Sequence, residues 1–193
     1  MPATLNAATR TAVTVRVMRD NVIDAYELAD LAARSNGGHW YADARAYAVS
    51  LASVRALSIE CTAGIIAALS PRTSWRRNIA AAEILAAGGT PVGILGRSVA
   101  DARAILAGAH PLDVLNGPKV RAFYHAILSA GRRGTAVIDA HATRIATRGQ
   151  FDTVAPCRYA DVAEAYALAA EVLSIPIHTV QAVTWCAARG TAE

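Results

Sequence analysis

Two ionisable residues in the middle of the chain have the types and spacing that electrostatic or covalent catalysis would use. Asp139 follows the apolar Val137 and Ile138 and precedes an amphipathic stretch, which predicts a helix N-cap. The helix dipole favours an anion there, and an ionised carboxylate stabilises positive charge that develops on a substrate. Lys119 lies twenty residues earlier and is the only lysine in the sequence. A lysine amine in a partly desolvated cleft is neutral often enough to act as a nucleophile and form a Schiff base.

Each of these two residues also has a purely structural interpretation. Asp139 could serve only as the cap of its helix, satisfying free backbone N–H groups. Lys119 could be a cation at a helix start that contacts phosphate or solvent. The sequence around Asp139 and Lys119 is therefore needed to choose between a catalytic and a structural role.

Three segments, in this order, carry a family resemblance: Leu69–Trp75, Leu115–Val120 and Val137–Ile145. Together they resemble the helix-hairpin-helix (HhH-GPD) DNA glycosylase superfamily, particularly its endonuclease III-like branch. The resemblance covers roughly residues 59–151. The residues in register with the family's last motif are Asp139, His141, Arg144, Arg148, Gln150 and Phe151.

The resemblance implies an all-α fold of two helical lobes with a cleft between them. One lobe would combine residues 1–58 and 139–193, and residues 59–138 would form the other, with Asp139 where the chain crosses between them. The implied function is action on a base, or on its N-glycosidic bond, in DNA. Asp139 would act electrostatically, and Lys119 would be the nucleophile whose Schiff base leads to strand cleavage.

Other residues of the three segments are candidates for contact with the substrate or with DNA. Ser70 and Thr73 could touch the target base, and Trp75 could either stack on it or belong to the core. Arg72 has a guanidinium that suits phosphate or an acidic base substituent. His141 is an orienting hydrogen-bond partner or a structural histidine. The remaining candidates are Gly117, Arg121 and Arg144, with Gln181 and Arg189 as further cleft or surface contacts.

The hairpin differs from the family pattern, which has two glycines separated by one residue. Only Gly117 is present here, and Pro118 removes one backbone donor, so phosphate anchoring by this turn is weakened and nearby arginines must compensate. A monovalent cation at the hairpin is the one ion that the resemblance allows. The chain has three cysteines, too few for the four-cysteine iron–sulfur cluster of many relatives, and we expect no other cofactor.

Two alternative functions remain open. Some superfamily members take part in hypermodification of thymine and replace a pyrophosphate on a base substituent, and compact chains without the cluster resemble bacteriophage-encoded members. Arg72 and Lys119 would then hold the acidic group, and no strand would be cleaved. Alternatively, the chain is a non-catalytic DNA-binding module that keeps the scaffold and has lost the chemistry.

The elements that must position these residues are predicted to be helices, because apolar residues recur at spacings of three and four without sustained alternation. We expect breaks at 35–38, 88–91, 108–111, 131–134 and 174–176, where glycine and proline gather. Thr135–Ile138 is expected to be an extended entry to a helix. The predicted helices are 7–33, with a possible break near Asn21, and 39–56, 59–69, 74–87, 99–107, 118–130, 140–149, 159–173 and 177–188.

Composition sets the wider expectations. Hydrophobic residues make up 54% and charged residues 18% of 193 residues, which excludes a disordered chain. The most apolar run, 59–69, is too short to span a membrane and contains Glu60. Residues 72–148 carry eleven basic and four acidic residues, a net +7 within a total of +4, so this segment could face a polyanion. We expect a cytoplasmic protein, in the host cytoplasm if phage-encoded, whose partner is DNA or a modified nucleotide.

Overall fold

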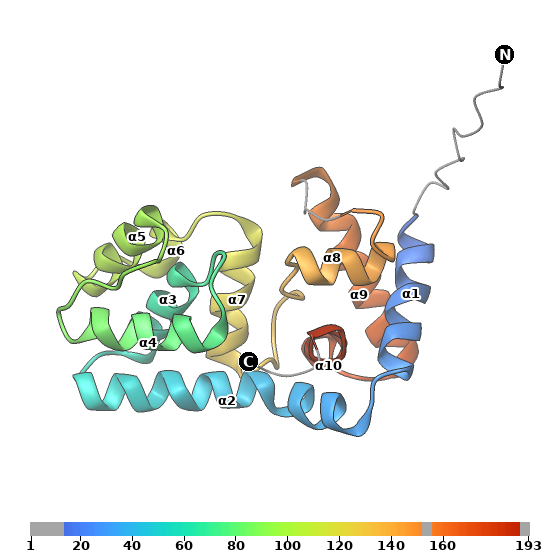
Figure 1. Ribbon diagram of the computed structural model, residues 1–193, viewed down its shortest axis with the longest axis horizontal. Helices are drawn as coiled ribbons and strands as arrows, with labels where there is room; N and C mark the ends of the chain where they lie inside the picture. The colour runs from blue at the N-terminus through green and yellow to red at the C-terminus, as the bar shows by residue number, and fades with distance from the viewer. Residues whose placement is uncertain (1–13, 152–155, 190–193) are drawn as a thin grey trace, which may run out of the picture.

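The predicted all-α fold class is confirmed by the computed structural model, which describes residues 14–151 and 156–189. These residues form ten helices and no strand (Figure 1). The helices are α1 (Val15–Glu27), α2 (Leu31–Arg55), α3 (Ile59–Leu69), α4 (Trp75–Ala86), α5 (Gly96–Leu106), α6 (Pro111–Val114), α7 (Pro118–Ser129), α8 (Ala140–Thr147), α9 (Pro156–Leu173) and α10 (Ile177–Arg189).

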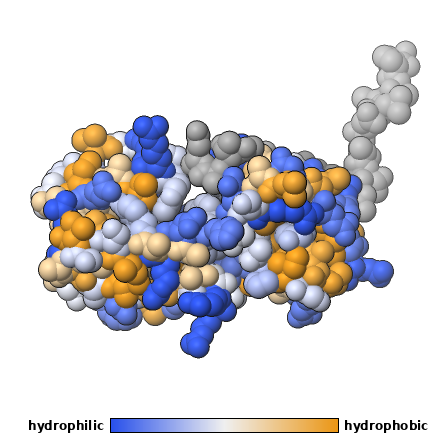
Figure 2. Space-filling model, turned by 90° about the horizontal axis from the view of Figure 1, so that it is seen from below, coloured by the Kyte–Doolittle hydropathy of each residue, from blue (hydrophilic) through white to orange (hydrophobic). Residues whose placement is uncertain are grey.

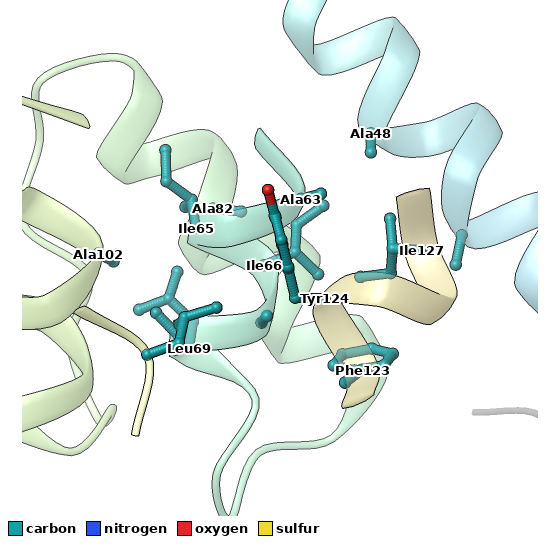
Figure 3. Close-up of a cluster of buried hydrophobic side chains, with 14 of the residues drawn as sticks. Ala48, Ala63, Ile65, Ile66, Leu69, Ala82, Ala102, Phe123, Tyr124 and Ile127 are labelled. Carbon is teal, nitrogen blue, oxygen red and sulfur yellow. The ribbon is translucent and has the colours of Figure 1, made fainter. Parts of the chain in front are cut away.

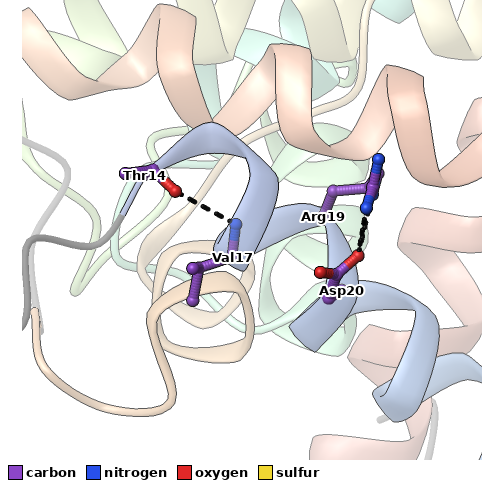
Figure 4. Close-up of polar contacts among 4 residues, drawn as sticks. All are labelled: Thr14, Val17, Arg19 and Asp20. Carbon is purple, nitrogen blue, oxygen red and sulfur yellow. Dashed lines mark hydrogen bonds and ion pairs between the residues drawn. The ribbon is translucent and has the colours of Figure 1, made fainter.

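Short polar side chains begin several of the helices by accepting a hydrogen bond from a free backbone N–H of the first turn. At α1, the Thr14 hydroxyl accepts a hydrogen bond from the Val17 N–H at 3.3 Å (Figure 4). The same figure shows the ion pair between Arg19 and Asp20 further along this helix, at 2.6 Å. Asp30 caps α2 in the same way, and Ser58 caps α3. Side-chain chemistry in the sequence therefore fixes where these helices start.

Buried apolar side chains form two clusters, which we call the first and second cluster. The first lies between α3, α4, α5, α7 and the C-terminal half of α2, and Figure 3 shows Ile65, Ile66 and Phe123 within it. The second lies between α1, α8, α9 and α10, with Tyr166 fully buried. Figure 1 shows α2 running beneath both groups of helices. One long helix, α2, thus supports both clusters. The lobe boundaries expected at 58/59 and 138/139 stay a prediction.

The predicted break at Ser35–Gly38 is wrong, because α2 continues through both glycines. A Cβ added to Gly37 would lie 2.4 Å from the Cα of Val183, so glycine here allows α2 and α10 to cross with their backbones in contact. The break falls earlier, between Glu27 and Leu31, and not near Asn21. The first part of the predicted helix 7–33, up to residue 13, lies outside the described residues.

The other predicted helices form within a few residues of the expected ends, and the short α6 was not predicted. The segment before Asp139 is neither helix nor strand, the N-cap Asp139 itself has an extended backbone, and Ala136, Val137 and Ile138 are buried. It carries the chain from the end of α7 to the start of α8. The start of α8, which bears the candidate residue Asp139, is thereby fixed by buried neighbours.

The surface is mixed, and large apolar side chains reach solvent at several positions. Figure 2 shows the underside, where apolar residues gather toward both ends and hydrophilic residues lie between them. Leu28, Leu31, Val54 and Val92 are the most exposed large hydrophobic side chains. Within residues 14–151 and 156–189, no single helix combines the length and hydropathy that a membrane span requires.

Candidate functional site

Asp139 is the N-cap of α8, as the sequence predicts, and two donors fix its carboxylate. Its Oδ1 accepts a hydrogen bond from the Ala142 N–H at 2.8 Å. Its Oδ2 accepts from the indole Nε1 of Trp185 at 3.2 Å, so α10 also holds this side chain. The buried Val137 and Ile138 anchor the backbone that precedes it. The carboxylate therefore has a defined position and does not rotate freely in solvent.

Lys119 is the second residue of α7, where Pro118 occupies the first helical position and Gly117 supplies a positive φ of 85°. Its Nζ donates a hydrogen bond to the hydroxyl of Ser70 at 3.3 Å and lies 6.0 Å from the ring centre of Phe123. Burial lowers the pKa of Lys119, and the carboxylate of Asp139 partly opposes that shift. The amine is thus neutral more often than a surface lysine.

Both groups line one small cavity, which we call the inner pocket, with a volume of about 100 Å³. Aromatic rings form much of its wall, and buried amides and hydroxyls supply polar groups. The aromatic residues are Trp40, Tyr41, Trp75, Phe123 and Trp185, and the polar ones are Ser70, Thr73, Asn78, Lys119, Asp139 and Gln181. A flat ring could lie between these aromatic side chains with its reacting atom near the carboxylate and the amine.

A larger cavity of about 670 Å³, the outer cleft, shares Ser70, Thr73, Lys119, Asp139 and Trp185 with the inner pocket. The starts of α7 and α8 both border it. Its other lining residues include Arg72, Gly117, His141 and Arg189. The outer cleft gives a bulky polar substrate a route to the inner pocket.

Most of the predicted site residues meet at these two cavities. Ser70 and Thr73 line both, and Trp75 lines the inner pocket while its ring also packs against the first cluster. Arg72 is exposed at the outer cleft and has a positive φ of 57°. His141 borders the same cleft and lies 3.5 Å from Arg144, with no hydrogen bond to Asp139 among the described residues.

Two predicted residues do not reach the site. The guanidinium of Arg121 donates to the carbonyls of Leu112 and Leu115, at 2.9 Å each, and so binds the residues at and after α6. Arg144 is exposed on α8 beside His141 and lines neither cavity. In the sequence Arg121 lies close to the hairpin residue Gly117. In the structure its guanidinium N–H groups are hydrogen-bonded to the carbonyls of Leu112 and Leu115, so they do not point into the site.

The sequence analysis did not name five aromatic or polar residues of the inner pocket: Trp40, Tyr41, Asn78, Phe123 and Trp185. One signal for Asn78 was present: it shares a helix face with Ala81, Ala82 and Leu85, at intervals of three, four and seven residues. A lone amide on an otherwise apolar face marks a buried polar contact. Trp40 has no such local signal, because it approaches the site only when α2 continues through Gly37 and Gly38.

No group of three or more His, Cys, Asp or Glu side chains in the described parts of the chain could hold a metal ion. The monovalent cation at the hairpin stays a prediction.

Comparison with curated proteins and with solved structures finds no match. A family model does match, over residues 4–192, which is almost the whole chain. The chain therefore belongs to the family of unknown function DUF7178.

Proposed function

We propose that this chain is an enzyme that acts on an unstacked nucleobase of DNA, or on the bond between that base and its deoxyribose. One observation carries the proposal: the only lysine of the chain and the carboxylate of Asp139 line the same small cavity, whose walls are aromatic. Aromatic walls suit a base, and a carboxylate beside an amine suits the sugar carbon to which the base is attached.

The proposed chemistry assigns one task to each of the two residues. As the N-glycosidic bond breaks, positive charge grows on the sugar, and the fixed carboxylate of Asp139 stabilises it. The neutral amine of Lys119 forms a bond to C1′ while the electrons of the broken bond leave with the base. Burial disfavours the charged amine and so lowers the pKa of Lys119, which increases the fraction of the neutral form. The base must first leave the duplex stack, at a cost of a few kcal/mol.

Borohydride trapping on duplex DNA that contains one abasic site tests this proposal. Because Lys119 is the only lysine, a reduced adduct on a side-chain amine must lie there, and peptide mapping separates it from the α-amino group. We expect an adduct with the native chain and none with Lys119→Ala. Arg97→Ala is the matched control, since Arg97 is exposed on α5 and its substitution also removes one positive charge.

The absence of an adduct at Lys119 in the native chain would contradict the proposed lyase step. A second candidate function then becomes the better one: replacement of a leaving group on a base substituent. Arg72 favours it, because its exposed guanidinium borders the outer cleft and makes no hydrogen bond or ion pair with the described residues. Mass spectrometry of nucleosides after incubation with modified DNA would identify such a product. A non-catalytic DNA-binding module would give neither result.

A further inference from the structure

Two buried amides line the inner pocket and take no part in the proposed bond cleavage. Asn78 is 2% exposed and Gln181 is 5% exposed. Each amide is held at one end by the protein. The Nδ2 of Asn78 donates to the carbonyl of Ile66 at 3.1 Å. The Oε1 of Gln181 accepts from the hydroxyl of Tyr41 at 2.6 Å.

These two hydrogen bonds determine what the opposite end of each amide offers. With Nδ2 engaged, Asn78 presents Oδ1 as an acceptor, and this buried oxygen has no hydrogen-bond partner among the described residues. With Oε1 engaged, Gln181 presents Nε2 as a donor, and no described residue accepts from it. The unpaired Oδ1 of Asn78 is buried, which is costly in a folded protein, and Nε2 of Gln181 remains available as a donor, so a ligand that pairs with both is favoured.

The pocket walls indicate the shape of that ligand. All three tryptophans of the chain line the inner pocket. The ring centre of Trp40 lies 5.2 Å from that of Trp75 and 6.3 Å from that of Trp185. Aromatic pocket walls bind either flat rings or organic cations. The amine of Lys119 and the carboxylate of Asp139 line the same pocket, so charge alone does not select a cation, whereas the free ends of the two amides match a flat ring with polar edges.

We infer that the inner pocket recognises a nucleobase by its hydrogen-bonding edge, with Asn78 accepting from an N–H of the base and Gln181 donating to a neighbouring acceptor. Tyr41 is the positioning residue, because its hydroxyl sets the orientation of the Gln181 amide. The inference rests on the proposed function for the way a base leaves DNA and reaches the pocket. It adds the residues that select the base.

Intrinsic tryptophan fluorescence measures occupancy directly, since every tryptophan lines this pocket. The probes are the four common deoxynucleosides, together with counterparts in which the edge N–H groups carry methyl groups. We expect at least one common deoxynucleoside to quench the fluorescence, and its methylated counterpart to bind about tenfold more weakly because the hydrogen bond to Asn78 is lost.

Variants separate hydrogen bonding from simple exclusion of the methyl group. Gln181→Met keeps the approximate volume and should weaken binding of the unmethylated nucleoside about tenfold. Tyr41→Phe keeps the buried ring, so it is the variant to use if Gln181→Met fails to fold. It should weaken binding because the amide is no longer held in one orientation. Gln150→Met is the matched control, since Gln150 is exposed and outside the pocket.

Three results would overturn the inference: no quenching by any of the four deoxynucleosides, equal binding of the methylated and unmethylated forms, or stronger binding of tetramethylammonium than of the nucleosides. The adduct and the nucleoside titration distinguish the two proposals, because they are separate measurements on the native chain. If the native chain binds nucleosides selectively but forms no adduct, base recognition stands and the lyase chemistry fails. If it forms the adduct but Gln181→Met and Tyr41→Phe bind nucleosides as the native chain does, the lyase chemistry stands and the base-recognition inference fails.

Discussion

At the scale of single residues, the site couples two opposite charges across one small cavity. Asp139 is fixed by donors from α8 and α10, whereas Lys119 makes one hydrogen bond, to Ser70. Burial and the nearby carboxylate shift the pKa of Lys119 in opposite directions, with burial the larger effect. The protonation state of the amine therefore depends on the carboxylate, and this dependence can be measured.

The first prediction concerns the titration of Lys119. Since it is the only lysine, a chain labelled with ¹³C-lysine gives one side-chain Cε signal, whose pH dependence reports its pKa by NMR. The midpoint should lie below the 10.5 of a solvent-exposed lysine, because burial disfavours the charged amine. Asp139→Asn should lower the midpoint further, since the carboxylate that favours the charged amine is gone.

Asparagine is as good an N-cap as aspartate, so Asp139→Asn should leave α8 and the fold intact. A midpoint that stays unchanged in this variant would show that the two side chains do not interact. The control variant Arg97→Ala, which changes a charge on α5, should leave the titration midpoint of Lys119 unchanged.

The sequence indicated Asp139 and Lys119 because each stands at a helix start with a marked residue type and spacing. It could not indicate Trp40, whose partners Trp75 and Trp185 at the site are 35 and 145 residues away in the chain. Contacts of that kind depend on tertiary packing, which leaves no local pattern. The aromatic part of the site was therefore less predictable than its charged part.

At the scale of helices, the crossing of α2 and α10 determines the geometry of the pocket. Trp40 and Tyr41 lie on α2 one turn after Gly37, and Gln181 and Trp185 lie on α10 on either side of Val183. The backbones meet where Gly37 has no side chain. The sequence rule that adjacent glycines break helices failed here, because tertiary contact at Gly37 outweighs the low helix propensity of glycine.

The two adjacent glycines give a matched test of this crossing. A Cβ at Gly37 would lie within 3 Å of Val183, so Gly37→Ala should force α2 and α10 apart and destabilise the fold by about 1–3 kcal/mol. Gly38 is exposed, with nothing within 4 Å of an added Cβ. Gly38→Ala should therefore stabilise the helix by about 0.5–1 kcal/mol.

Urea unfolding of both variants measures these two effects. In addition, Gly37→Ala should weaken nucleoside binding in the inner pocket, because the tryptophans on the two helices separate. Equal stability of Gly37→Ala and Gly38→Ala would contradict the close crossing.

At the scale of the whole molecule, the polar site opens where the two clusters meet. The inner pocket takes Phe123 and Tyr41 from the first cluster, and Trp40 packs against both clusters. The all-α class was predictable from periodicity alone, because it depends on local spacing. The position of the pocket was not, since it depends on how α2 aligns the two clusters.

Charge is the other property of the whole molecule that bears on function. Residues 72–148 carry a net charge of +7, more than the +4 of the whole chain, and Arg72 of this segment borders the outer cleft. If DNA enters through this cleft, its phosphates release counterions as arginines bind them, and the affinity must fall as salt rises. Each phosphate contact contributes a fixed amount to the slope of log affinity against log salt concentration.

Arg72→Asn should therefore reduce the magnitude of that slope by about 0.9, the contribution of one phosphate contact on duplex DNA. Asparagine tolerates the positive φ at this position, so backbone strain does not obscure the loss of charge. Fluorescence anisotropy of a labelled duplex at several salt concentrations measures the slope, with Arg97→Ala as the control that should leave it unchanged. A weaker but equally salt-dependent complex in Arg72→Asn would mean that Arg72 contacts a base or its substituent. That result would favour the hypermodification chemistry over simple anchoring of the DNA backbone.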